Sequence, residues 1–256
     1  MSDFNLAHWA LLACAALGAG VLNAVAGGGS FLTFPALVLT GIPPIAANAT
    51  SALAVSPGYL GSSWGFKAEL AALPRRVLLQ EAIVAALGGL VGAALLLLTP
   101  AKVFAGLVPW LLLFATALFA FGPSLLKRLG LGSRSQDKHS IYRLLGLAFV
   151  AIYGGYFNGG LGILLMALYA LSGESRIHTA NALKNANSLV LSLLSVAAFA
   201  WAGAIVWTQG VWMMAWATLG GFLGARIARR LSAAVVRTLV IATGLLMFVW
   251  FLPRPQ

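Results

Sequence analysis

The chain has 256 residues, of which 61% are hydrophobic and only 8% are charged. An average soluble domain carries roughly 25% charged residues, so this composition excludes a soluble globule and indicates an integral membrane protein built from helices. The net charge of +11 would suggest nucleic-acid binding in a soluble protein. Here the cations gather at the ends of apolar segments, at Arg75–Arg76, Lys127–Arg143 and Arg226–Arg237. We therefore interpret them as topology signals and exclude nucleic acid as a partner.

Apolar segments follow one another along the whole chain, separated by turn residues and charges. A helix needs ~20 apolar residues to cross the hydrocarbon layer. Two segments, 31–41 and 161–172, are too short to span comfortably alone, and each follows a glycine-rich break. The sequence predicts 8–10 transmembrane segments, depending on whether the short pieces span or are re-entrant. The apolar segments lie at 6–26, 31–41, 46–65, 77–98, 103–122, 143–158, 161–172, 178–203, 208–227 and 234–252.

The two halves of the chain resemble each other. A shift of 133 residues places Ala47-Asn48-Ala49 on Ala180-Asn181-Ala182, and it also aligns the glycine breaks. Each half reads as a long helix, a break, a short apolar piece, an Ala-Asn-Ala helix start and two more long helices. We predict two repeats of about five helical segments each, at 1–126 and 143–256, joined by a cytoplasmic linker at 127–142.

Charges in matching loops indicate how the repeats are oriented. The loop at 65–76 carries Lys67, Arg75 and Arg76, whereas its counterpart at 203–210 is uncharged. The next matching pair has the opposite bias, with one lysine at 99–102 and four arginines at 226–237. Matching loops of opposite charge lie on opposite sides of a membrane. The repeats are therefore predicted to be inverted, with five crossings each and both termini outside; four crossings each is the alternative.

Glycine-rich breaks at membrane depth point to a binding site. Irregular backbone is tolerated there only where it is packed in protein or lines a wet cavity. Gly27-Gly28-Gly29 is predicted to interrupt a helix, and Gly159–Gly162 is its counterpart. The helix that begins after such a break presents free amides and a partial positive charge, which attract anions. The glycines at 88–89, 92, 220–221 and 224 are predicted to allow close helix packing instead.

A polar stripe runs along the segment at 178–203. Its members recur every three or four residues, as on one face of a helix: Asn181, Lys184, Asn185, Ser188, Ser192 and Ser195. Interhelical hydrogen bonds would explain the serines. A cation at the bilayer centre costs at least ~2.5–3.5 kcal/mol, so Lys184 either faces a substrate or extends to the interface. In the first half, Asn48, Thr50 and Ser51 form a shorter cluster.

Other polar residues carry less information about function. Glu81 lies near the start of its span, where it either relays protons or pairs with the helix dipole or a nearby arginine. The three histidines, at 8, 139 and 178, have no carboxylate or cysteine at metal-ligand spacing. Neither a hydrolase elbow nor a nucleotide-binding loop is present. The sequence therefore predicts no enzyme, no metal and no cofactor.

The paired motifs resemble a known family. Asn23-Ala-Val-Ala-Gly-Gly-Gly-Ser30 and Ala47-Asn-Ala-Thr-Ser51, with their echoes Gly159-Gly-Leu-Gly162 and Ala180-Asn-Ala-Leu-Lys-Asn185, are similar to the signature repeats of the TauE/SafE sulfite exporter family. The resemblance covers nearly the whole chain. It implies a multi-pass permease of the bacterial inner membrane with a duplicated fold. It also implies a sulfur oxyanion substrate such as sulfite or a sulfonate.

The sequence thus predicts a secondary transporter that binds a small oxyanion between the two halves. An anion channel and a non-transporting membrane subunit that binds a partner protein stay open as alternatives. The exact anion, the direction of transport, the coupling ion and homo-oligomer formation are not determined. The predicted substrate-binding residues are Gly27, Gly28, Gly29, Ser30, Asn48, Thr50, Ser51, Gly160, Gly162, Asn181, Lys184 and Asn185.

Overall fold

The computed structural model describes residues 5–25, 27–128, 141–174, 176–227 and 233–251. Every regular element in these ranges is an α-helix, which confirms the predicted all-α class. One element falls where a loop is predicted, the five-residue helix α4 at 67–71. In chain order the helices are α1 (Leu6–Val25), α2 (Ser30–Leu39), α3 (Pro44–Gly65), α4 (Lys67–Ala71), α5 (Arg75–Leu98), α6 (Ala101–Arg128), α7 (Ile141–Tyr156), α8 (Leu161–Leu171), α9 (Ile177–Trp201), α10 (Trp207–Ile227) and α11 (Ala233–Phe251).

The distribution of side chains is that of a membrane protein. Large apolar side chains face outward, such as Leu87 and Phe149, which are 59% and 68% exposed. Small and polar side chains lie inside, including Asn48 and Ser51. Within the described residues, the stretches Leu6–Asn23, Arg75–Leu98 and Ile177–Trp201 are long and apolar enough to cross a bilayer. The molecule therefore presents apolar surface to lipid and keeps its polar groups for its interior.

Each short helix doubles back along the helix before it. A Cβ added to Gly18 or to Gly29 would meet Leu32 or Ala19 respectively, so α1 and α2 run antiparallel. The same holds for α7 and α8, because Gly154 lies against Leu161 and Gly146 against Leu168. The sequence predicts that each break interrupts a helix. The structure shows instead that the chain reverses its direction at each break, so that the short helix packs back against the long one. Each short helix therefore runs back toward the end of the bundle at which its hairpin begins.

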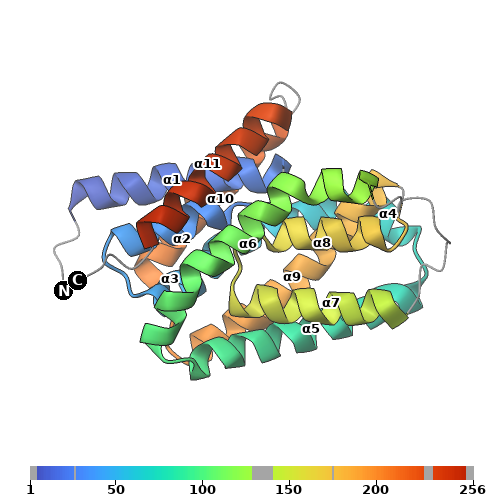
Figure 1. The fold of residues 1–256 in the computed structure, drawn as a ribbon, viewed down its shortest axis with the longest axis horizontal. Coiled ribbons are helices and arrows are strands. Elements are labelled where there is room, and N and C mark those ends of the chain that lie inside the picture. The colour runs from blue at the N-terminus through green and yellow to red at the C-terminus, as the bar shows by residue number, and fades with distance from the viewer. Residues whose placement is uncertain (1–4, 26, 129–140, 175, 228–232, 252–256) are drawn as a thin grey trace.

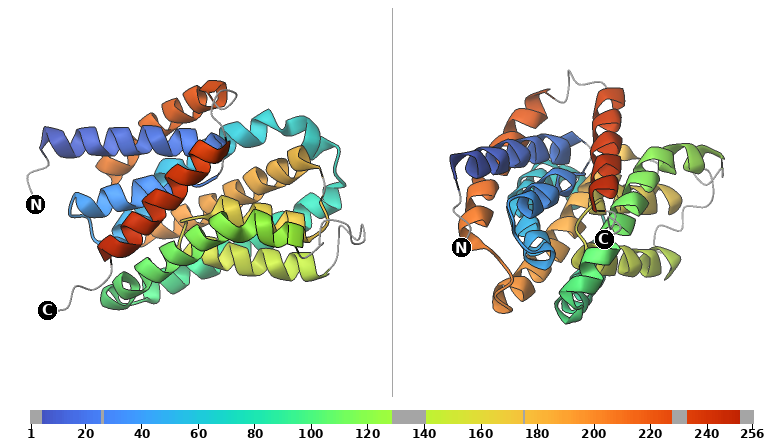
Figure 2. Two further views of the ribbon diagram at one scale, coloured as in Figure 1. Left: turned by 45° about the horizontal axis from the view of Figure 1, so that its top comes forward. Right: turned by 60° about the vertical axis from the view of Figure 1, so that its left-hand side comes forward.

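The hairpins enter from opposite ends of the helix bundle. In Figure 1, α1 begins and α11 ends at the left, whereas α6 ends and α7 begins at the right, and the left view of Figure 2 agrees. Packing is reciprocal, because α1 lies along α10 and α7 lies along α5. The first helix of each half thus packs against a helix of the other half in a reciprocal pattern, α1 with α10 and α7 with α5, and inverted repeats would produce such a pattern. The duplication stays a prediction, and most of the proposed linker, 129–140, lies outside the described residues.

Glycines allow the helices of the two halves to approach closely, as predicted. A Cβ on Gly92 of α5 would lie 2.1 Å from the Ile152 carbonyl oxygen of α7. Between α1 and α10, a Cβ on Gly220 would lie 2.1 Å from the Leu17 carbonyl oxygen. Real side chains do not reach such distances, so only glycine permits this backbone contact. Gly88 and Gly89 make similar contacts, with α7 and α9.

A buried ion pair joins α5 to the second hairpin and to α9. The Arg143 guanidinium of α7 binds the Glu81 carboxylate of α5, and both residues are at most 4% exposed. The Tyr169 hydroxyl of α8 donates to Glu81 over 3.0 Å, and the Asn187 amide of α9 donates to the same oxygen over 2.7 Å. Arg143, predicted to be a topology signal at a segment end, is instead a buried partner of Glu81.

We expect Gly92→Ala to weaken the packing of α5 against α7. The added methyl group would overlap the α7 backbone, and overpacking of this kind costs about 1–3 kcal/mol. Thermal unfolding in detergent measures the change. Gly106→Ala in α6 is the matched control, because no atom lies within 4 Å of its added Cβ. Equal unfolding temperatures for the two variants would contradict the close packing.

We expect Glu81→Gln to destabilise the protein by about 3 kcal/mol, because it leaves the Arg143 charge buried without the carboxylate. Arg143→Met alone should cost a similar amount. The double variant should recover much of the loss, since it removes both charges together. Unfolding free energies of the four proteins in one detergent close this thermodynamic cycle. Strict additivity of the two single losses would show that the pair contributes no coupling.

Candidate functional site

The two glycine breaks meet inside the bundle. A Cβ on Gly162 would lie 2.7 Å from the carbonyl oxygen of Gly27 and 2.9 Å from its Cα. Gly27 and Gly160 both adopt φ of +80°, which side-chain-bearing residues rarely adopt. The sequence thus requires glycine here for two reasons, the reversal of the chain and the contact between hairpins. The predicted convergence of the two breaks is present in the structure.

Lys184 of α9 lies beside this contact. A Cβ on Gly27 would lie 3.5 Å from the Lys184 ammonium nitrogen, and the side chain is only 4% exposed. The lysine therefore points into the protein instead of extending to the membrane interface. No hydrogen bond or ion pair joins its ammonium group to another described residue. We call Gly27, Gly162 and the Lys184 ammonium group the glycine junction.

Backbone amides at the breaks are free to bind a ligand. The amides of Gly28, Gly29, Gly160 and Gly162 have no acceptor among the described residues. Helix α2 begins directly after Gly29, at the buried Ser30, and α8 begins directly after Gly160, so that Gly162 lies in its first turn. Amides at a helix start carry partial positive charge and bind anions readily. Together with Lys184 they give the junction a positive character.

Asn48 holds the second break in place. Its amide nitrogen donates to the Tyr156 carbonyl over 3.2 Å, and its side-chain oxygen accepts from the Asn158 amide over 3.4 Å. Both partners belong to the other half of the chain, at the end of α7 and in the loop that follows it. Asn48 therefore acts on the site through the backbone of the break, and its own polar atoms are already engaged.

The other predicted side chains are placed differently. Thr50 accepts from the Val206 amide at 3.0 Å, and the Ser51 hydroxyl lies 2.6 Å from that of Thr33. These hydroxyls are engaged in helix packing. Asn181 is partly exposed, and its side-chain amide donates to the Ile177 carbonyl of its own helix. Asn185 is buried and has no side-chain hydrogen bond to a described residue.

The last two members of the α9 stripe, Ser192 and Ser195, form interhelical hydrogen bonds. The Ser192 hydroxyl lies 2.6 Å from that of Ser56 in α3. Ser195 donates to the Gly89 carbonyl of α5 over 3.1 Å. The prediction that the serines of the stripe form hydrogen bonds between helices is therefore confirmed for Ser192 and Ser195 but not for Ser188. The functional part of the stripe narrows to its first turns, around Lys184.

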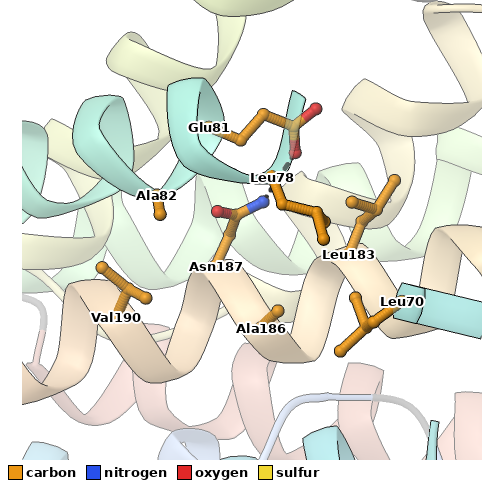
Figure 3. A pocket seen from close by; sticks show the side chains of 8 residues that line it. All are labelled: Leu70, Leu78, Glu81, Ala82, Leu183, Ala186, Asn187 and Val190. Carbon is orange, nitrogen blue, oxygen red and sulfur yellow. Dashed lines mark hydrogen bonds between the residues drawn. The ribbon is translucent and has the colours of Figure 1, made fainter. Parts of the chain in front are cut away.

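A separate pocket of about 160 Å³ lies between α4, α5 and α9. Figure 3 shows Glu81 and Asn187 side by side at its edge, joined by a hydrogen bond. The remaining lining is apolar: Leu70, Leu78, Ala82, Leu183, Ala186 and Val190. The Asn187 amide in the wall already donates to Glu81 and Tyr169, and the other lining residues are apolar. The pocket therefore offers an anion no unengaged donor and does not suit the predicted substrate.

Sequence reasoning missed two groups of polar residues. Tyr169, Asn187 and Arg143 complete the surroundings of Glu81, and Asn158 lies in the second break with its side chain unpaired. A carboxylate within a membrane segment needs a buried partner, which was the available signal for the first group. Asn158 gave no comparable signal, because only the fold shows that its amide has no partner. Among the described residues no histidine, cysteine or carboxylate cluster could hold a metal ion.

Similarity to known proteins agrees with this architecture. Residues 12–251 match the family described as sulfite exporter TauE/SafE. The chain is 31% identical to the "Probable membrane transporter protein" of Haemophilus influenzae over 96% of this chain and 94% of that protein. It is 26% identical to "Probable membrane transporter protein ORF9" of Sinorhizobium sp, over 100% of this chain and 96% of that one.

The "Probable membrane transporter protein YfcA" of Escherichia coli K12 is 27% identical over 90% of this chain and 84% of its own length. No solved structure matches the chain. The match to the family spans nearly every helix, including both hairpins and the lysine-bearing α9. The chain belongs to the TauE/SafE sulfite exporter family and is a membrane transporter, not an enzyme.

Proposed function

We propose that the protein is a secondary transporter that exports a small sulfur oxyanion, such as sulfite or an organosulfonate, across the bacterial inner membrane. The glycine junction carries this proposal. A buried ammonium group with no described counter-charge lies beside two helix starts whose amides have no described acceptor. Both features are costly in an empty apolar interior, and an anion satisfies both.

The anion would lie where the two hairpins meet. Amides of Gly28, Gly29, Gly160 and Gly162 donate to its oxygens, and Lys184 neutralises its charge. Gly27 and Ser30 shape the first break, and Asn48 holds the second. Asn185 follows Lys184 in α9 and offers a buried amide. Thr50 and Ser51 support the site by packing, whereas Asn181 donates within its own helix.

The arrangement of the hairpins supports alternating access. The α1–α2 hairpin enters from one end of the bundle and α7–α8 enters from the other (Figure 1). A solute bound beside the contact between their tips would lie inside the bundle, between the two ends. Movement of one half against the other would therefore open the site to each side in turn.

Uptake by proteoliposomes containing the pure protein tests the function. We expect sulfite and methanesulfonate to be transported, with accumulation that depends on an imposed ion or pH gradient, at carrier rates. Protein-free liposomes correct for passive leakage. Absence of flux for every sulfur oxyanion would overturn the proposal, and conductance far above carrier turnover would identify an anion channel instead.

We expect Lys184→Gln to raise the apparent KM for the anion at least about tenfold, since a charge-assisted hydrogen bond is lost. Lys184→Arg keeps the positive charge and should retain more activity than the glutamine variant. Lys102→Gln is the matched control, because Lys102 is exposed at the start of α6. Unchanged transport by Lys184→Gln at normal membrane abundance would remove Lys184 from the site.

A further inference from the structure

Two buried polar side chains on the elements that form the glycine junction have no hydrogen-bond partner among the described residues. Neither the oxygen nor the nitrogen of the Asn158 amide has a hydrogen bond in the structure, and the residue is only 4% exposed. The Ser188 hydroxyl is likewise unpaired and fully buried. Unsatisfied polar groups are costly inside a membrane protein, because no bulk water can pair with them. Such groups are therefore expected to bind a polar ligand.

Both side chains belong to the elements that form the junction. Ser188 follows Lys184 by one turn of α9, so the two lie on the same helix face. Asn158 lies in the second break, four residues before Gly162, and its backbone amide is held by Asn48. Gly162 in turn contacts Gly27 beside the Lys184 ammonium group. The second break and the Lys184 face of α9 thus carry, on neighbouring residues of the chain, a cation, amides without a described acceptor and two unpaired side chains.

The charge of the region selects the charge of its ligand. Among the described residues, two cations are buried, Arg143 and Lys184. Arg143 is paired with Glu81, so Lys184 supplies a single positive charge. A monoanion is neutralised by this charge. A dianion would leave one net negative charge in a low-dielectric interior, which is strongly unfavourable.

The hydrogen-bonding groups of the site also select which monoanion binds, according to whether it can donate a hydrogen bond. A fully ionised oxyanion only accepts hydrogen bonds, which suits the ammonium group, the glycine amides and the Asn158 NH₂ group. The Asn158 side-chain oxygen only accepts as well, and such a ligand would leave it unpaired. An anion that keeps one O–H group donates to this oxygen while its other oxygens accept.

We propose that the site selects monoanions that retain a hydroxyl group, hydrogensulfite being the simplest, and that Asn158 recognises the hydroxyl. This inference rests on the proposed function and adds the protonation state of the substrate. Asn158 determines specificity because its NH₂ group donates to an oxygen of the ligand while its side-chain oxygen accepts from the hydroxyl group of the ligand. Ser188, beside Lys184, contributes a hydroxyl that donates or accepts as the ligand requires.

Other titratable groups near the break act equally on all substrates. Tyr153 of α7 donates to the Gly159 carbonyl over 3.0 Å, and the Tyr156 hydroxyl lies 3.4 Å from that of Thr99. Glu81 of α5, Arg143 of α7 and Tyr169 of α8 belong to the ion-pair cluster. A control substrate that does not titrate separates their effects from the protonation of the substrate.

Proteoliposome exchange measured across neutral pH tests the proposal. Sulfite gains its proton in this range, whereas methanesulfonate keeps one charge and never carries a hydroxyl. We expect sulfite exchange per total sulfite to rise as pH falls, in proportion to hydrogensulfite, while methanesulfonate exchange stays flat. Sulfate, a dianion, should be exchanged at least about tenfold more slowly than either. Parallel pH profiles for sulfite and methanesulfonate would overturn the proposal.

Asn158→Leu tests the recognising side chain, since it keeps the volume and removes both polar groups. The preference for hydrogensulfite over methanesulfonate should fall about tenfold, the ratio that one hydrogen bond provides, while methanesulfonate exchange persists. Ser63→Ala is the control, because its buried hydroxyl is also unpaired but lies at the far end of α3. An unchanged preference in Asn158→Leu would overturn the role of Asn158.

The wild-type pH profiles decide the proposal even if the Asn158 variant does not fold. They also separate it from the proposed function. Wild-type protein that exchanges no anion contradicts the transporter of sulfur oxyanions itself. Protein that exchanges sulfate as rapidly as hydrogensulfite supports transport and contradicts only the selection of hydroxyl-bearing monoanions.

Discussion

The architecture depends on a contact between two backbones in the middle of the bundle, Gly27 against Gly162. Each belongs to a hairpin tip, where the chain reverses and its amides lose their helical acceptors. In hydrocarbon such amides would be prohibitively unfavourable. Joining the tips shields them from lipid and gathers them in one place. The two backbones can touch because neither glycine has a side chain. The Lys184 ammonium group lies beside this contact.

The two polar clusters of the interior differ in how completely they are satisfied. Around Glu81, an arginine, a tyrosine and an asparagine supply donors to one carboxylate. This network ties α5 to α7, α8 and α9. The groups around Lys184 have no described partners, although they are equally buried. A satisfied cluster stabilises a fold, whereas an unsatisfied one is suited to a ligand.

The predicted duplication makes the difference between the halves informative. Counting back 133 residues from Lys184 and Ser188 leads to Ser51 and Val55 of α3. Ser51 is paired with Thr33, and Val55 is apolar. At these two positions the second helix carries a cation and an unpaired hydroxyl, whereas the first carries a paired hydroxyl and an apolar side chain. A substrate between the tips would be bound mainly by residues of the second half, with the first contributing backbone.

The sequence by itself determined the helical membrane class, the breaks, the close-packing glycines and the presence of a lysine within a membrane segment. These follow from composition and spacing, which act locally along the chain. Only the tertiary structure decided that the breaks reverse the chain, that Arg143 pairs with Glu81, and that Asn158 is left unpaired. A glycine permits a reversal without specifying its direction, and partners distant in sequence are chosen by packing. Whether a polar atom is satisfied depends on all its neighbours, which only the folded chain brings together.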